Sequence, residues 1–299
     1  MVLFANPAFA QSVTVIKSRK FEAFDQVIKS FVDANTSISA DQVIEYNLEG
    51  KKENWKKIRE KISPTDSRFI LAMGPLPAQM AKESLSNIPI IFCMVSNPHR
   101  YGLSGENLVG ISMDVPGETQ FTQYKSVMPN LKTLGVIYDP QKSEALVSEA
   151  NLAAQKLGLE LIMTPVSSHK KVPKALRDML GKIDALWMVP DDTVLTTASF
   201  RFFLVTSFEK KLPFLAISDI FVKVGALATI APAPTELGHQ ISQLANQLQS
   251  GELDLTQVDI LAPKQTNLVI NVKTAKKIGL DLSPEILESA SKLYNNLSQ

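Results

Sequence analysis

The sequence has almost none of the residues on which disulfide bonds, metal sites and redox pairs depend. It contains one cysteine, Cys93, and three histidines, His99, His169 and His239, in 299 residues. A single cysteine excludes an internal disulfide and any two-cysteine chemistry. Because the histidines are scattered and show no metal-ligand spacing, neither a metal site nor a cofactor is expected.

The chain also lacks an excess of charge of either sign and any long apolar run. The formal net charge is +1, which gives no electrostatic reason to expect nucleic acid or an anionic membrane as partner. No segment reaches the roughly 18 apolar residues of a membrane span, so insertion into a membrane is not expected. With 45% hydrophobic and 20% charged residues, the chain can build a core and form one or two domains.

The common catalytic motifs are missing as well. There is no G-x-S-x-G, which signals the nucleophile elbow of a hydrolase. G-x-G-x-x-G, the phosphate-binding loop G-x-x-x-x-G-K-[ST] and the zinc motif H-E-x-x-H are absent too. The sequence therefore predicts a protein that is not an enzyme. A hydrolase or isomerase on a doubly wound fold remains an alternative, which turnover of a small substrate would support.

The most informative stretch runs from residue 87 to residue 103, NIPIIFCMVSNPHRYGL. Its nearly unbroken apolar run is typical of a strand buried on both faces. Ser96 and Asn97 follow directly. In an open parallel sheet, ligands bind just beyond the carboxyl ends of the strands, so these two side chains are candidate ligand contacts. The alternative is that they only close a turn, since Ser, Asn and Pro are common turn formers.

Short apolar runs alternate with amphipathic segments along the whole chain, and the pattern occurs twice. Before residue 114 it predicts strands at 13–16, 43–46, 69–73, 88–95 and 109–113. After residue 118 it predicts strands at 134–138, 159–163, 185–189, 214–217 and 226–230, followed by 258–261, 268–271 and a final helix from residue 284. Regular alternation of strand and helix predicts an α/β fold with two doubly wound parallel sheets, each covered by helices on both faces.

The first eleven residues differ from the rest. Ala8-Phe9-Ala10 before Gln11 has the small-residue pattern of a signal-peptide cleavage site. We interpret residues 1–11 as the remnant of a secretory signal, which predicts a periplasmic protein; an ordinary apolar N-terminus is the alternative. The expected first lobe is 12–115 with 234–262, and the expected second lobe is 116–233 with 263–299.

Polar or turn-forming residues follow most of the predicted strands. If these strand ends line one cleft, they form a ligand site; its candidates are Ser18, Gly74, Pro75, Ser96, Asn97, Asp139, Asp191 and Asp219. Asp191 and Asp219 would suit an ammonium or a hydroxyl-rich ligand. For Asp191 or Asp192 the alternative is a helix N-cap. Tyr101 and Phe221 are the aromatic candidates next to this cleft.

Several segments, in this order, resemble the ABC-transporter substrate-binding protein family of the tryptophan-binding type. They are IPIIF-x-x-VSNP-x-x-x-GL, NLVGIS, P-x-L-K-T-L-G-V-I-Y-D-P, ALWMVPDDTVLTTAS, LPFLAISD-x-x-V-K-x-GAL, a G-H-Q helix ending in SGE, and LVINVKTAKKIGLDLSPEILESA. The resemblance implies a type I periplasmic-binding fold with three crossovers between two lobes. It also implies a ligand clamped between the lobes, often an amino acid or another small organic solute.

Three positions depart from the pattern of that family. Met73-Gly74-Pro75-Leu76 stands where the family usually has a small hydroxyl residue, which leaves backbone N–H groups as donors and adds Leu76 to the candidate contacts. Asn97 stands where the family often has Asp, and Asp139 where it often has Asn. The resemblance therefore does not identify the ligand.

The function predicted from these observations is periplasmic capture of a small organic solute and its delivery to an ABC permease. A monomer is expected. The alternative is a ligand-sensing subunit that docks on a membrane receptor, or sensor, instead of a permease.

Overall fold

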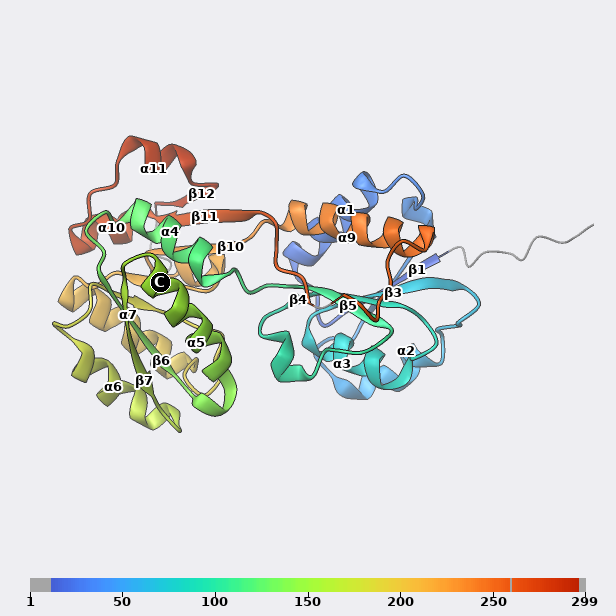
Figure 1. Cartoon of the computed structure of the whole chain (residues 1–299), viewed down its shortest axis with the longest axis horizontal. Coiled ribbons are helices and arrows are strands. Elements are labelled where there is room, and N and C mark those ends of the chain that lie inside the picture. Colours follow the sequence, from blue (N-terminus) through green and yellow to red (C-terminus); the bar gives the residue numbers. More distant parts are fainter. Residues whose placement is uncertain (1–11, 259, 296–299) are drawn as a thin grey trace, which may run out of the picture. The chain divides into compact units, whose positions relative to one another are not determined.

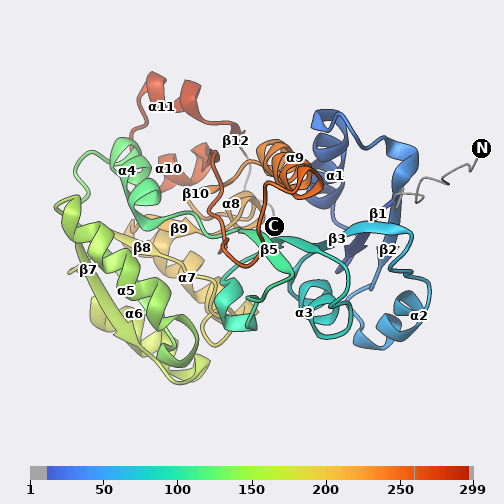
Figure 2. The ribbon, with the colours of Figure 1, turned by 45° about the vertical axis from the view of Figure 1, so that its right-hand side comes forward.

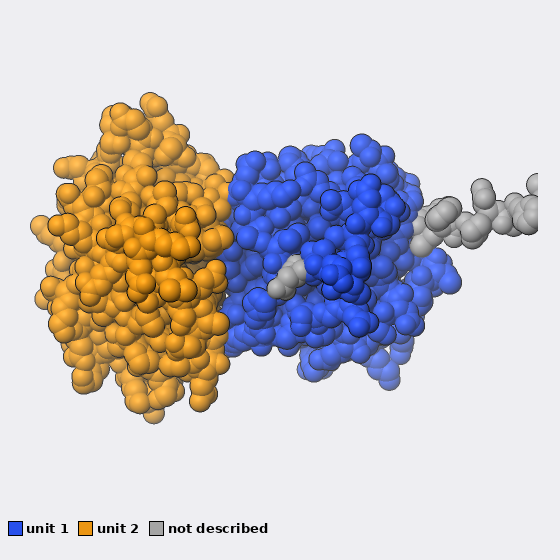
Figure 3. Space-filling view, in the orientation of Figure 1, with its two compact units in different colours: residues 1–114, 232–265 blue, residues 115–231, 266–299 orange. Residues whose placement is uncertain are grey.

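The computed structural model describes residues 12–258 and 260–295; the expected signal remnant lies outside them. The chain forms two compact units, which Figure 3 shows in different colours. Unit 1 comprises Met1–Asp114 and Pro232–Gln265, and unit 2 comprises Val115–Ala231 and Thr266–Gln299. Each unit is built around its own sheet, as the sequence pattern predicts.

Unit 1 holds a five-stranded sheet in the order β2-β1-β3-β4-β5, in which every pair is parallel. Its strands are β1 Ser12–Lys17, β2 Val43–Asn47, β3 Ser67–Met73, β4 Ile90–Val95 and β5 Leu108–Ser112. Figures 1 and 2 show α1 (Glu22–Ala34) beside α9 (Pro234–Ser250) on one side of this sheet, with α2 (Trp55–Arg59) and α3 (Pro75–Ser84) on the other.

Alternation along the strands of unit 1 divides its core into two layers. Val13 and Val15 of β1 pack with α1 and α9, whereas Ile16 packs with α2 and α3. Phe69 and Leu71 of β3 likewise belong to the first layer, and their neighbours in that strand to the second. Successive side chains of a strand point to opposite faces, so a strand that is apolar throughout requires helices on both sides.

Unit 2 holds a seven-stranded sheet in the order β12-β11-β10-β9-β8-β6-β7. Its strands are β6 Thr133–Tyr138, β7 Glu160–Pro165, β8 Ala185–Trp187, β9 Phe214–Ala216, β10 Ala228–Pro232, β11 Thr266–Asn271 and β12 Lys292–Tyr294. Its helices are α4 Gly117–Val127, α5 Pro140–Lys156, α6 Val172–Met179, α7 Thr197–Lys210, α8 Asp219–Lys223, α10 Val272–Ile278 and α11 Pro284–Ser289. Side chains of α4, α5 and α10 belong to one core layer, and those of α6, α7 and α8 to the other.

The two units repeat one strand order. In unit 1, β2 lies on one side of β1, and β3, β4 and β5 follow in order on the other side of β1. β7-β6-β8-β9-β10 of unit 2 has the same arrangement. The order therefore reverses between β1 and β3 in unit 1, and between β6 and β8 in unit 2. Such a reversal is the place where doubly wound folds bind ligands, beyond the carboxyl ends of the strands.

The sequence pattern was wrong at the C-terminal end of the chain. The predicted strand at 258–261 is reduced, among the described residues, to a single bridge between Ile111 and Leu261. The final helix ends at Ser289 and is followed by β12, a strand that the pattern did not predict. β12 is mostly exposed and has no apolar run, whereas the equally short strands β8 and β9 are fully buried and apolar.

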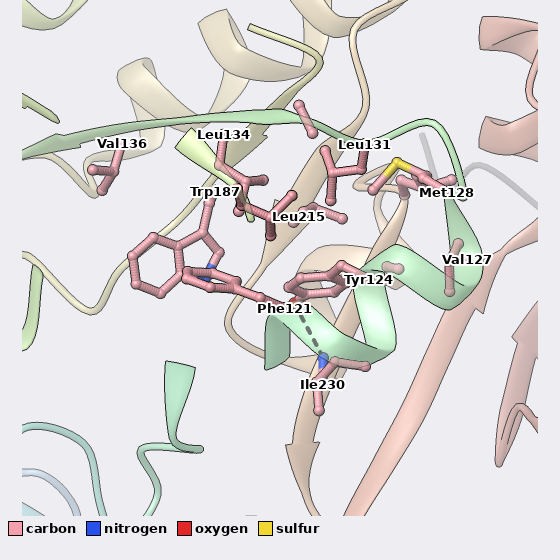
Figure 4. Close-up of a cluster of buried hydrophobic side chains, with 14 of the residues drawn as sticks. Phe121, Tyr124, Val127, Met128, Leu131, Leu134, Val136, Trp187, Leu215 and Ile230 are labelled. Atoms are coloured by element: carbon pink, nitrogen blue, oxygen red, sulfur yellow. Dashed lines mark hydrogen bonds between the residues drawn. The ribbon is translucent and has the colours of Figure 1, made fainter. Parts of the chain in front are cut away.

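The core of unit 2 contains a fully buried tyrosine, Tyr124 (Figure 4). Its hydroxyl accepts a hydrogen bond from the Ile230 N–H at 3.3 Å. The pairing of β9 with β10 ends at Thr229. The Tyr124 hydroxyl is therefore the acceptor for the N–H of the next residue, which lies beyond the paired part of the two strands. Burial raises the pKa of the Tyr124 hydroxyl well above its ordinary value. The side chain therefore stays neutral and acts as a structural acceptor.

Replacing Tyr124 by phenylalanine is expected to lower the free energy of unfolding by about 1–3 kcal/mol, since it leaves a buried N–H without its acceptor. Urea unfolding measures this loss. Tyr138→Phe is the matched control, because its hydroxyl bonds to the exposed Glu144 and not to a buried backbone group. Equal losses of unfolding free energy in the two variants would show that the hydrogen bond to the Ile230 N–H contributes no more to stability than the exposed one.

Candidate functional site

In unit 1 the point where the strand order reverses is formed by the loops after β1 and β3. The Ser18 N–H donates to the Met73 carbonyl at 3.0 Å, and the Gly74 N–H donates to the Cys93 carbonyl at 2.9 Å. Gly74 has a φ of 98°, and a Cβ on it would lie 2.7 Å from the Ser18 Oγ. Glycine is therefore needed here for both its backbone conformation and the close approach of the serine.

These loops offer few polar groups to a ligand. Pro75 and Pro77 at the start of α3 have no N–H, so Leu76 supplies the N–H there that lacks an intrahelical acceptor. Ser18 is partly exposed, and no hydrogen bond of its hydroxyl occurs within the described part of the chain. The Ser18 hydroxyl and the Leu76 N–H are therefore the donors that these loops keep for a ligand.

The end of β4 has an unusual backbone. Met94 and Asn97 have φ values of 58° and 49°, and the register of β4 with β5 shifts between Phe92 and Val95. Left-handed conformations of residues other than glycine cost on the order of 1–3 kcal/mol and concentrate at ligand sites. Met94 is partly exposed, so the expectation of a strand buried on both faces is wrong at this residue.

Asp114 holds this segment in place. Its Oδ2 accepts a hydrogen bond from the Asn97 N–H at 2.7 Å and another from the Ser112 hydroxyl at 2.8 Å. The Asn97 N–H is therefore used by a hydrogen bond within unit 1. The neighbouring Ser96 is partly exposed. Sequence reasoning did not find Asp114, which lies just after β5, although an aspartate at a strand end is the signal that identified other candidates.

In unit 2 the corresponding loops are joined by Asp191, which is fully buried. Its Oδ2 accepts from the Asp139 N–H at 2.7 Å and the Ser143 hydroxyl at 2.9 Å. Its Oδ1 accepts from the N–H groups of Thr193 at 3.0 Å and Val194 at 3.3 Å. Four donors within unit 2 therefore use both oxygens of this carboxylate.

This arrangement corrects the expectation that Asp191 faces a ligand, because the carboxylate is out of reach and already satisfied. The alternative of a helix N-cap is wrong as well, because α7 begins at Thr197 and its N-cap is Thr196. Asp191 instead holds the turn that follows it, through the N–H groups of Thr193 and Val194. Asp139 has a similar role, since it caps α5 through the Gln141 N–H and accepts from the Thr193 hydroxyl at 2.7 Å. Asp192, by contrast, is exposed and pairs with Lys142.

Asp219 begins α8, after β9, and its Oδ2 lies 2.8 Å from the Lys292 Nζ. Its other oxygen is buried and has no partner among the described residues. The hydrogen bond that the Lys292 ammonium donates to the Asp219 Oδ2 raises the pKa of this lysine above its ordinary value. The carboxylate that was expected to bind a ligand ammonium thus already binds a cation of the chain itself. Sequence reasoning missed Lys292 because it lies on β12.

The aromatic candidates have different surroundings. Tyr101 lies under the Arg100 guanidinium, and Phe221 packs against Phe200 with ring centroids 4.8 Å apart. A third ring, Phe21, was not among the predicted site residues, although it follows β1 closely. It is 50% exposed and stands edge-on to the buried Phe24.

Two further findings limit the chemistry of the described residues. They contain no group of three or more His, Cys, Asp or Glu side chains that could hold a metal ion. Burial raises the pKa of the Cys93 thiol far above its ordinary value, so this thiol is unreactive.

No helix in the described part of the chain is long and apolar enough to cross a membrane.

Comparison with known proteins agrees with this architecture. A tyrosine-binding protein of Clostridioides difficile (strain R20291) is 26% identical over 242 residues, which cover 78% of this chain and 69% of the relative. A ligand-free, open structure of a substrate binding protein with adhesive properties from Clostridium difficile matches with a TM-score of 0.76 and 22% identity, over 96% of this chain and 100% of that chain.

An ABC domain from Streptococcus pneumonia in complex with L-Trp has a TM-score of 0.66 and 21% identity, over 94% of this chain and 99% of that chain. At such identities, the two solved structures show the fold alone. The model of the family described as ABC transporter substrate binding protein matches residues 9–294. The chain therefore belongs to the ABC transporter substrate binding protein family.

Proposed function

We propose that this protein binds an aromatic amino acid in the periplasm and delivers it to an ABC permease. Its family consists of substrate-binding proteins. The relative from Clostridioides difficile binds tyrosine, and the solved relative from Streptococcus pneumonia contains L-Trp. Both ligands are α-amino acids with an aromatic ring, which is the ligand class that we infer for this chain.

The observation that carries the proposal is the strand order that both units repeat. In each unit it brings two loops together at a reversal of the sheet, where α/β folds bind small molecules. In unit 1 these loops present the Ser18 hydroxyl and the Leu76 N–H. In the proposed mechanism the ligand stabilises the bound conformation only through contacts that the ligand-free conformation lacks.

Calorimetric titration with L-tryptophan and L-tyrosine tests the proposed function. We expect saturable binding of at least one of them with one site per chain, and weaker or no binding of L-leucine. A ligand at 100 times its dissociation constant should also add about 2.7 kcal/mol to the free energy of unfolding. Absence of binding and of thermal stabilisation with both aromatic amino acids would reject the proposal.

Replacing Asp219 by alanine is expected to weaken binding of the aromatic amino acid by about tenfold or more, if the ligand ammonium takes the place of Lys292 on this carboxylate. One charge-assisted hydrogen bond contributes roughly 1.5–3 kcal/mol, and about 1.4 kcal/mol corresponds to a factor of ten. Calorimetric titration of the variant measures the change.

Lys292→Met is the matched variant, because it breaks the same ion pair and leaves the carboxylate in place. It should bind the amino acid at least as tightly as the wild type does, since it removes a competing cation. If both variants lose affinity equally, the ion pair and not the carboxylate supports binding, and Asp219 is not a ligand contact.

A further inference from the structure

One aromatic side chain of unit 1 is exposed where a ligand would approach. Phe21 lies in the segment between β1 and α1, four residues after the last residue of that strand. Half of its surface is exposed. Among the described residues of unit 1, the other large apolar side chain with such exposure is Ile44, which lies on the edge strand β2.

Phe21 also marks the start of a helix. It is the N-cap residue of α1, and its side chain makes no capping hydrogen bond. Ser, Thr, Asp or Asn at an N-cap accepts a bond from the first turn, as Thr196 does for α7. The start of α1 therefore lacks a side-chain capping hydrogen bond, and an exposed aromatic ring occupies the N-cap position.

The ring is held close to the loops at the reversal of the sheet. It stands edge-on to Phe24, with centroids 5.7 Å apart and planes at 89°. Phe24 is 6% exposed, and the tip of its ring would lie 3.8 Å from a Cβ on Gly74. Phe24 thus packs between the Phe21 ring and Gly74, the glycine that the Ser18 hydroxyl approaches. A braced ring loses little conformational freedom when a ligand packs on it.

We propose that Phe21 is the residue of unit 1 that selects the aromatic side chain of the ligand. An indole or phenol ring packs against the exposed ring of Phe21, while Ser18 and Leu76 supply the neighbouring hydroxyl and N–H. This inference rests on the proposed function and deepens it. It assigns ring recognition to the loop after β1, whereas the sequence pointed to Tyr101 and Phe221.

Three variants at this position separate ring packing from simple apolar cover. Phe21→Leu keeps an apolar side chain over Phe24 without a ring, Phe21→Ala removes both, and Phe21→Trp keeps a ring. Aromatic pairs add enough free energy beyond their buried area for a change of up to about tenfold in affinity. We therefore expect about a tenfold rise in the dissociation constant of L-tryptophan for Phe21→Leu and at least that for Phe21→Ala, with near wild-type binding by Phe21→Trp.

Calorimetric titration of the full chain with L-tryptophan and L-tyrosine provides the readout, and thermal unfolding without ligand monitors the fold. Ile44→Ala is the control, as an exposed apolar residue outside these loops. Wild-type affinity in Phe21→Leu would overturn the inference and leave the proposed function intact. Failure of the wild type to bind either amino acid would overturn both. A loss of affinity that follows a lower melting temperature in all three variants would show that Phe21 only stabilises α1.

Discussion

Replacing Asp191 by alanine is expected to lower the free energy of unfolding of unit 2 by about 3–5 kcal/mol. The carboxylate is fully buried and accepts four hydrogen bonds, three of them from backbone N–H groups. Each buried donor that loses its partner costs about 1–3 kcal/mol, and rearrangement of the loop recovers part of the sum. The loops after β6 and β8 would separate, because this side chain connects them.

Urea unfolding followed by tryptophan fluorescence measures this effect. The chain has two tryptophans, so a Trp55→Phe background leaves Trp187 of unit 2 as the reporter. Asp192→Ala is the control, since the neighbouring carboxylate is exposed and its ion pair with Lys142 should contribute no more than about 1 kcal/mol. A loss below about 1 kcal/mol in both variants would contradict the structural role of Asp191.

Much of this fold follows from the sequence pattern because the strands are long enough to show it. Apolar runs such as residues 69–73 and 134–138 predict buried parallel strands, and both are found. The two-unit architecture follows from the repetition of the pattern. β12 is mostly exposed and lacks the apolar run that marks the equally short buried strands β8 and β9, so neither this strand nor Lys292 on it could be predicted.

The candidate site was less predictable because residue type does not reveal what a side chain faces. Asp191 and Asp219 both follow strands, yet one is buried among four donors and the other pairs with a lysine. That difference depends on loops far away in the sequence. In the sequence, Phe21 shares the helical spacing of Phe24 and Ile28, and only its exposure and its edge-on contact with Phe24 separate it from the core.

Replacing Gly238 by alanine is expected to destabilise unit 1 by about 3 kcal/mol, although alanine favours a helix over glycine by about 1 kcal/mol. Gly238 lies in α9 where that helix crosses α1. A Cβ on it would lie 2.6 Å from the Phe31 nitrogen and 2.6 Å from the Val27 carbonyl oxygen. Both atoms belong to the backbone, so no side-chain rotation relieves the clash and the helices must move apart.

Separation of these helices would also weaken the hydrogen bonds that join them. The Asn35 Nδ2, just beyond α1, donates to the Ser242 hydroxyl at 3.1 Å and the Asn246 Oδ1 at 3.0 Å. Urea unfolding with Trp55 as the reporter of unit 1 measures the loss. Gln249→Ala, on the exposed face of α9, is the control and should be neutral or slightly stabilising. If Gly238→Ala were also neutral or stabilising, helix propensity would outweigh the contact, and the close crossing of α1 and α9 would be refuted.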